Sequence, residues 1–352
     1  MAKVLMKGNE AMAEAAIRAG CKAFFGYPIT PQNEIPEYFA RELPKHGGVF
    51  LQAESELAAM NMVMGASASG ARVMTSTSGP GYCLKLETLA AMTLTRLPAV
   101  IVVVMRSGPA FGTMKAAQED YRMTGNGGYK VVTFAPSTVQ EAADMTFEAF
   151  DIADRYRNPV VVMADGMIGQ MMGSVDFDKL PEKRRDLPEK TWALHGSNSR
   201  GGRHVFLYLP EGKTHYGAKY ESETVLYPEL TRNEIKVEIV NVEDAEIVMA
   251  AYGTAARMCR AAVEELGGKI RLGIIRPKTL WPYPYDAFEK IGPWCKAIIC
   301  PEINTIGQMI DDVRIAAAGR WPVYHIGDSE TDFLTPDRIV DKVAQVWEDT
   351  KK

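Results

Sequence analysis

The sequence lacks the features that mark several large classes of protein. Its 352 residues include 40 Lys or Arg and 44 Asp or Glu, and the formal charge of −4 offers no basic face for nucleic acid. No apolar run is long enough to cross a bilayer. The N-terminal stretch MAKVLMKGNEAMAEAA has no apolar signal-peptide core. We therefore expect a cytoplasmic protein that binds neither nucleic acid nor membrane.

Cysteine and histidine are also scarce, which limits metal and redox chemistry on this chain. Iron–sulfur sites usually carry closely spaced thiolates. The cysteines form no C-x-x-C pair, and the histidines form no H-x-x-x-H pair. The five cysteines are Cys21, Cys83, Cys259, Cys295 and Cys300. We expect no metal ligands here, and if the protein does redox chemistry with iron–sulfur clusters, those clusters belong to another chain.

Common nucleotide and nucleophile motifs are missing as well. There is no Walker A sequence and no G-x-S-x-G elbow. Gly79-Pro80-Gly81 follows a strand-like segment, but Leu84 stands where a dinucleotide fingerprint would have its third glycine. The chemistry must therefore come from less familiar groupings of side chains.

The pattern that is present is α/β. Strand-like and helix-like segments alternate through the first half, and the continuous apolar run AVIVVVM at 99–105 is typical of a parallel strand buried on both faces. From 174 to 240 the chain is charged, Pro-broken and Gly-rich, which indicates a linker or surface excursion. The α/β pattern then resumes. We predict one domain at 1–173 and a smaller α/β domain at 241–352.

Three short segments follow predicted strands and could carry chemistry. In GYPITP at 26–31, the Thr30 hydroxyl lies between two prolines and could donate to a substrate carboxylate. The same pattern fits a rigid turn with Thr30 as a helix cap. Arg106 follows AVIVVVM and could bind an anion with two hydrogen bonds, or form a structural salt bridge.

The third segment is acidic. Glu54-Ser55-Glu56 opens an apolar helix, where an acid often caps the helix and interacts with its dipole. Alternatively, one carboxylate is buried and shares a proton with a ligand nitrogen. Because ligands of parallel sheets bind beyond the carboxyl ends of strands, Thr30, Glu56 and Arg106 converge if their strands are neighbours.

These segments resemble a known family. Together they are similar to the alpha subunit of 2-oxoacid:ferredoxin oxidoreductases, nearest to the 2-oxoisovalerate (3-methyl-2-oxobutanoate) branch. The later segments IIRPKTLWPYP and PEINTIGQM are similar to the transketolase C-terminal-like domain of that subunit. The segments that carry the resemblance in the first half are GNEA at 8–11, GYPITP at 26–31, ESELAA at 54–59, TSGPG at 77–81 and DGMIGQ at 165–170.

The resemblance implies a fold and roles for individual residues. The first domain would be a parallel-sheet pyrimidine-binding domain for thiamine diphosphate. Glu56 would hydrogen-bond N1′ of the aminopyrimidine and so promote loss of the thiazolium C2 proton, with Glu54 as the alternative acid. Thr30 and Arg106 would hold the 2-oxoacid carboxylate, and Pro28 and Ile29 would border the cofactor.

The resemblance also implies partner chains. A diphosphate-binding beta subunit would bring Mg²⁺, and a gamma subunit and a ferredoxin-like iron–sulfur subunit would complete the complex. The substrates would be a 2-oxoacid and coenzyme A, with electrons passed to ferredoxin. The only comparable Gly-Asp pair here, Gly327-Asp328, has no Asn after it. Two other possibilities remain: the beta chain of a lipoamide-linked 2-oxoacid dehydrogenase, and a scaffold subunit without catalysis.

Overall fold

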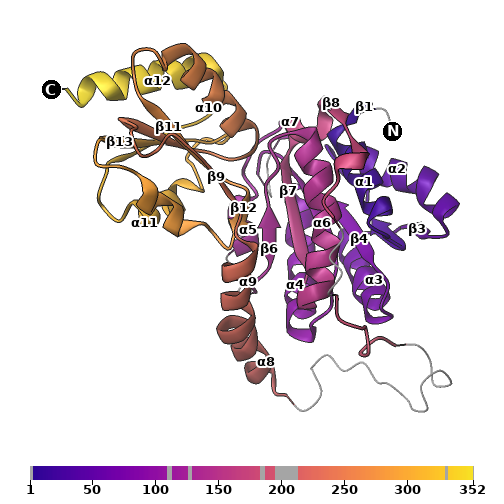
Figure 1. Cartoon of the computed structure of the whole chain (residues 1–352). Coiled ribbons are helices and arrows are strands. Elements are labelled where there is room, and N and C mark those ends of the chain that lie inside the picture. Colours follow the sequence, from indigo (N-terminus) through magenta and orange to yellow (C-terminus); the bar gives the residue numbers. More distant parts are fainter. Residues whose placement is uncertain are drawn as a thin grey trace.

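Two α/β units, each built on its own sheet, make up the chain (Figure 1). The computed structural model describes residues 3–108, 113–125, 129–182, 187–194, 213–329 and 332–351. Both sheets are parallel apart from one antiparallel edge strand each, β12 in the first and β9 in the second. The predicted fold class is therefore confirmed. The limits set at 173 and 240 stay a prediction, and 183–186 and 195–212 lie outside the described residues.

The first sheet has seven strands in the order β12-β6-β7-β5-β4-β2-β3. Successive residues of β5 face opposite sides, as a doubly covered strand requires. Val102 packs on the side of helices α1 and α6, and Val103 on the side of α3 and α4. The strands are β2 (Ala23–Gly26), β3 (Val49–Gln52), β4 (Val73–Thr77), β5 (Val100–Met105), β6 (Val132–Phe134), β7 (Val160–Asp165) and β12 (Thr279–Trp281).

Helices cover both faces of this sheet. They are α1 (Gly8–Arg18), α2 (Glu34–Glu42), α3 (Glu56–Ala68), α4 (Gly79–Thr95), α5 (Tyr121–Gly125), α6 (Val139–Tyr156) and α7 (Gly166–Gln170). A small antiparallel pair, β1 (Val4–Lys7) with β8 (Met172–Val175), lies beside α1 and α6. Helices α8 (His215–Glu221) and α9 (Tyr227–Glu234) follow, joined through a π-helical turn at Ser222–Leu226, and α8 packs on α4.

The second sheet has the order β14-β13-β10-β11-β9. Its strands are β9 (Val237–Val240), β10 (Ile247–Ala250), β11 (Leu272–Pro277), β13 (Ala297–Pro301) and β14 (Val323–Ile326), and its helices are α10 (Gly253–Leu266), α11 (Ile310–Ala317) and α12 (Pro336–Asp349). Strand order reverses at β10, whose two parallel neighbours are β11 and β13. A crevice at such a reversal is the usual ligand site of an open α/β sheet.

In this chain the first unit occupies that crevice. The Gln118 side chain donates to the carbonyl of Tyr252 (3.0 Å) and accepts from the backbone N–H of Ile303 (3.0 Å). The Asp165 carboxylate accepts from the backbone N–H of Thr254 (2.7 Å) at the start of α10. An anionic side chain thus takes the place at this helix N-terminus that a phosphate takes in nucleotide-binding folds.

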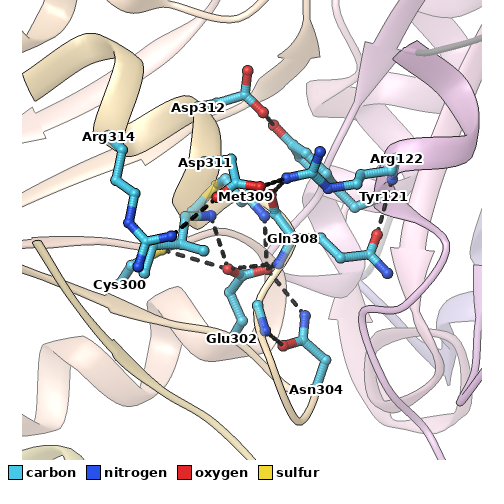
Figure 2. Close-up of polar contacts among 12 residues, drawn as sticks. Tyr121, Arg122, Cys300, Glu302, Asn304, Gln308, Met309, Asp311, Asp312 and Arg314 are labelled. Atoms are coloured by element: carbon cyan, nitrogen blue, oxygen red, sulfur yellow. Dashed lines mark hydrogen bonds and ion pairs between the residues drawn. The ribbon is translucent and has the colours of Figure 1, made fainter. Parts of the chain in front are cut away.

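A second set of contacts fixes the loop before α11 against α5 (Figure 2). The buried Glu302 carboxylate accepts from Asn304 Nδ2 and from the backbone N–H groups of Gln308 and Met309, at 2.9–3.1 Å. Gln308 Oε1 in turn accepts from the backbone N–H of Arg122. The segment PEINTIGQM therefore builds the joint between the two units.

No helix in the described part of the chain is both long and apolar enough to cross a membrane. The cytoplasmic location stays a prediction.

Candidate cofactor and substrate site

The GYPITP turn leaves the carboxyl end of β2 and is held by side chains from two other motifs. The carbonyl of Pro31 accepts from Asn9 Nδ2 (2.8 Å) and from Gln170 Nε2 (2.6 Å). Both amides also donate to Glu34 Oε2. Segments far apart in the sequence thus fix one turn, which gives Thr30 a defined place.

Arg106 lies directly after β5 and reaches this turn. Its Nη1 donates to the carbonyl oxygen of Thr30 at 3.0 Å. Its Nε is buried without a hydrogen-bond partner, and no residue in the described ranges forms an ion pair with it. Within the described part of the chain, the structural salt bridge considered from the sequence is therefore not formed, and the guanidinium keeps donors for an anion.

Glu56 is the first residue of α3, and its side chain is only 6% exposed. The capping role that an acid could play there belongs to Ser55, whose hydroxyl accepts from the backbone N–H of Ala58 at 3.1 Å. Glu54 is exposed to solvent. Burial therefore favours Glu56 over Glu54 as the acid of an enclosed site.

The first turn of α4 leaves room for the Glu56 carboxylate. A Cβ atom placed on Gly81 would lie 2.4 Å from Glu56 Oε1 and 2.4 Å from Thr77 Oγ1. A Cβ on Gly79 would lie 3.0 Å from Arg106 Nε. The two glycines of TSGPG thus admit the acid on one side of this turn and the guanidinium on the other.

Strand order explains why these groups meet. In the order β5-β4-β2-β3, the strands that precede Arg106, Thr30 and Glu56 all end at the same edge of the sheet. The structure brings the three residues to this edge, as predicted. Pro28 and Ile29 lie in the same turn, with Pro28 exposed and Ile29 half-buried.

The polar atoms at this edge suit an aminopyrimidine and a carboxylate. No described residue hydrogen-bonds the Glu56 carboxylate, and Thr77 Oγ1 and Ser78 Oγ are buried without partners. Buried polar atoms in native proteins normally have a partner. The unpaired groups at this edge, an acid, two hydroxyls and a guanidinium, therefore fit the ring nitrogens of thiamine and the carboxylate of a 2-oxoacid. Among the described residues, no three acidic, His or Cys side chains gather in a way that could hold a metal ion.

Sequence reasoning missed several residues that shape the site. Asn9 and Gln170 stand in segments that carried the family resemblance, but nothing in the pattern assigned them a contact. Asp120 is fully buried, and its Oδ2 accepts from the backbone N–H groups of Gly79 (3.3 Å) and Arg106 (3.4 Å). Lys85, in α4, is fully buried too. No signal distinguishes these two from surface charges, because burial depends on packing between distant segments.

Comparison with known families supports the same interpretation. Residues 14–200 match the family described as "Pyruvate flavodoxin/ferredoxin oxidoreductase, thiamine diP-bdg". Residues 245–338 match "Pyruvate:ferredoxin oxidoreductase core domain II".

Curated relatives cover nearly the whole chain. Ketoisovalerate oxidoreductase subunit VorB of Methanothermobacter thermautotrophicus is 42% identical over 91% of this chain and 91% of its own length. 2-Oxoglutarate synthase subunit KorA of Methanocaldococcus jannaschii is 38% identical over 88% of this chain and 90% of its own.

Solved structures agree on the fold. The 2-oxoglutarate:ferredoxin oxidoreductase from Magnetococcus marinus matches 98% of this chain and 65% of its own with a TM-score of 0.85 and 26% identity. A split-gene transketolase, 15% identical with a TM-score of 0.62, shares the fold alone. The edge where Glu56, Thr30 and Arg106 meet lies within the thiamine-diphosphate-binding match, and the chain belongs to the 2-oxoacid:ferredoxin oxidoreductases as a subunit of the VorB and KorA type.

Proposed function

We propose that this chain supplies the pyrimidine half of a thiamine diphosphate site that oxidises a 2-oxoacid to its acyl-CoA and sends electrons to ferredoxin. The observation that carries the proposal is the buried carboxylate of Glu56, which lies over Gly81 without a hydrogen-bond partner in the described chain. Thiamine diphosphate, when bound, supplies the carbanion that attacks the 2-oxo carbon.

Glu56 acts on the aminopyrimidine nitrogen. Its carboxyl group holds a proton against N1′ and moves it toward the ring when the cofactor is activated. The lack of a Cβ at Gly81 lets the carboxylate lie close to α4, and the N-cap at Ser55 fixes the start of its helix. The start of the helix that carries Glu56 is therefore fixed before the cofactor binds, which reduces the entropy lost on reaching the reactive geometry.

Thr30 and Arg106 bind the carboxylate of the substrate. The hydrogen bond from Arg106 to the carbonyl of Thr30 uses one of the five N–H groups of the guanidinium. The remaining donors are available for a planar carboxylate, which Arg binds with two parallel hydrogen bonds. Pro28 and Ile29 border the cofactor on the same turn.

A partner chain completes the site. Four large apolar side chains are exposed on the elements that flank the site, on β3, at the start of α3 and in the first turns of α4: Val49, Leu51, Leu57 and Leu84. Exposed apolar patches of this kind mark protein interfaces. A diphosphate-binding beta subunit that carries Mg²⁺ covers this surface, and a gamma subunit and an iron–sulfur subunit complete the complex.

The substrate is a branched-chain 2-oxoacid. Two relatives named as ketoisovalerate oxidoreductase subunits are 42% and 40% identical to this chain, and two named as 2-oxoglutarate synthase subunits are 38% and 34% identical. Coenzyme-A-dependent dye reduction by the reconstituted complex tests this assignment. A kcat/KM for 3-methyl-2-oxobutanoate above that for 2-oxoglutarate supports it, and the reverse order contradicts it.

Glu56→Ala tests the role of the acid. In the complex assembled with its partner subunits, we expect turnover to fall at least about 100-fold, because a positioned acid–base group is lost. Glu54→Ala is the matched control on the exposed acid two residues earlier and should leave turnover unchanged. An assembled Glu56→Ala complex with near-normal turnover would exclude Glu56 from this role and favour a scaffold subunit.

A further inference from the structure

Lys85 is a buried charge that the functions assigned so far do not use. It lies in the second turn of α4 and is 0% exposed. Its Nζ donates to Thr75 Oγ1 at 2.9 Å, and no described residue forms an ion pair with it. A fully buried lysine without a paired carboxylate is rare and costly, because an ammonium ion loses its hydration on burial. Such a group usually has a functional reason.

Lys85 and Glu56 lie on the same side of α4, where this helix faces β4. Gly81 and Lys85 are four residues apart and therefore share one face of α4. Glu56 Oε1 and Thr77 Oγ1 both lie 2.4 Å from the position of a Cβ on Gly81. Thr75 and Thr77 are two residues apart and share one face of β4. A buried polar strip thus runs from Lys85 past the two threonines to Glu56, and within it the Thr77 hydroxyl has no hydrogen-bond partner.

Glu56 is also the charged group that shifts the pKa of Lys85. Burial lowers the pKa of Lys85 to about 7, and the Glu56 carboxylate opposes this by raising it. Glu56 is the only titratable residue of α3, and neither β4 nor β5 has any. The charges of α8 lie toward the other end of α4, where Glu221 acts on Arg96. The two charged groups of this strip therefore interact mainly with each other.

We propose that Lys85 is a positioning residue for Glu56, whose buried ammonium group drives the Glu56 proton toward the aminopyrimidine nitrogen. This inference rests on the role proposed for Glu56. As the carboxyl O–H bond breaks, a bond from the proton to N1′ forms, and the positive charge of Lys85 stabilises the carboxylate left behind. Without that charge, the carboxylate formed by the transfer is less stabilised and the transfer is slower.

The first test measures deuterium exchange at the C2 atom of bound thiamine diphosphate in the assembled complex, without 2-oxoacid. Lys85→Met should slow exchange at least about tenfold, because Glu56 is then a less effective proton donor. The variant is expected to fold, since an apolar residue of similar volume often replaces a buried charge without loss of stability. Thr93→Val, at another buried polar residue of α4 that bonds only the Ala90 carbonyl, is the matched control and should exchange at the wild-type rate.

A double variant separates this inference from the proposed function. If Lys85 acts through Glu56, Lys85→Met should add nothing to the effect of Glu56→Gln. Effects that multiply, or a wild-type exchange rate in Lys85→Met, would overturn the positioning role while leaving Glu56 intact. A wild-type rate in Glu56→Gln would instead overturn the proposed function.

The second test needs no cofactor. In the chain labelled with ¹³C at lysine Cε, the resonance that Lys85→Met removes should titrate with a pKa of about 7. Glu56→Gln should lower that pKa, because it removes the charge that raises it. An unchanged pKa would show that the two groups do not interact and would overturn the proposal. If Lys85→Met does not assemble, Thr75→Val removes the Lys85 acceptor instead and should also slow C2 exchange.

Discussion

At the scale of single residues, the site depends on the lack of a Cβ atom at Gly81. Gly81→Ala would place a Cβ 2.4 Å from both Glu56 Oε1 and Thr77 Oγ1, so the carboxylate must move. A displacement of about 1 Å in a catalytic group can cost about 100-fold in rate, and we expect a loss of that order in the assembled complex. Gly65→Ala, in α3 with open space around its Cβ, is the matched control. It should keep full turnover and stabilise the helix by about 0.5–1 kcal/mol.

Asp120 makes stability depend on pH. Burial raises its pKa to about 7, from an ordinary value of about 3.9. Because the folded state binds the proton more tightly, the stabilisation is complete below the ordinary value and is lost as pH rises through 7. The difference corresponds to at most about 4 kcal/mol.

Asp120→Asn removes this dependence. The amide oxygen can still accept from the backbone N–H groups of Gly79 and Arg106, and the variant cannot ionise. Urea denaturation should find it more stable than the wild type at pH 8 and by a smaller margin at pH 5. Parallel stability curves for the two proteins across this range would contradict the assignment.

The sequence predicted the site residues that stand at strand ends and missed those that are merely buried. Thr30, Glu56 and Arg106 follow β-rich segments, so the rule for parallel sheets places them at one edge. Lys85 and Asp120 follow no such rule. Their environment arises from packing between segments far apart in the sequence, which a local pattern does not record.

At the scale of elements, the carboxylate of Asp165 accepts hydrogen bonds at the start of two helices from different units. Asp165 caps α7 through the backbone N–H of Ile168 (3.1 Å) and accepts from both the backbone N–H and the hydroxyl of Thr254 (2.7 Å each) at the start of α10. Asp165→Ala should lower the free energy of unfolding by about 2–4 kcal/mol, since it removes two caps and leaves buried donors unpaired. Chemical denaturation measures this loss.

Thr335→Ala provides the comparison for Asp165. Thr335 is exposed and caps α12 alone through the backbone N–H of Arg338. Its loss should cost about 1 kcal/mol, the usual value for a single N-cap. Equal losses in the two variants would mean that Asp165 is an ordinary cap that does not join the units.

Elements that are strongly apolar or periodic were predicted, and the helices of the charged, Pro-broken stretch were not. The strands β5 and β7 and the helix α6 are strongly apolar or periodic. Helices α8 and α9 lie in a stretch that the charge and proline content marked as a linker, and their formation was not predicted. Propensity is weak there, and contacts such as that of α8 with α4 supply the stability.

At the scale of the whole molecule, the joint between the two units combines a shared apolar cluster with specific hydrogen bonds. No sequence rule predicted it, because a side-chain amide that bridges two sheets has no periodic signature. The Gln118 amide hydrogen-bonds Tyr252 and Ile303, and its own backbone N–H donates to the carbonyl of Ile303 at 2.8 Å. The second unit thus uses its ligand crevice to bind the first, so its sheet contributes rigidity and orientation to the site across the joint.

Gln118→Ala should loosen this joint without unfolding either unit. The buried N–H of Ile303 and the carbonyl of Tyr252 lose their partner, and each unpaired buried group costs about 1–3 kcal/mol. We expect hydrogen exchange at Ile303 to become faster and thermal unfolding to broaden or divide into two transitions. The hydrogen bonds of Gln118 across the joint are lost, and the apolar cluster that the two units share is then left beside one further cluster lying largely within each unit. Gln140→Ala is the matched control, since the Gln140 amide also bonds backbone and side chain but stays within the first unit. It should leave a single transition, and the same result in Gln118→Ala would show that the apolar contacts alone hold the two units together.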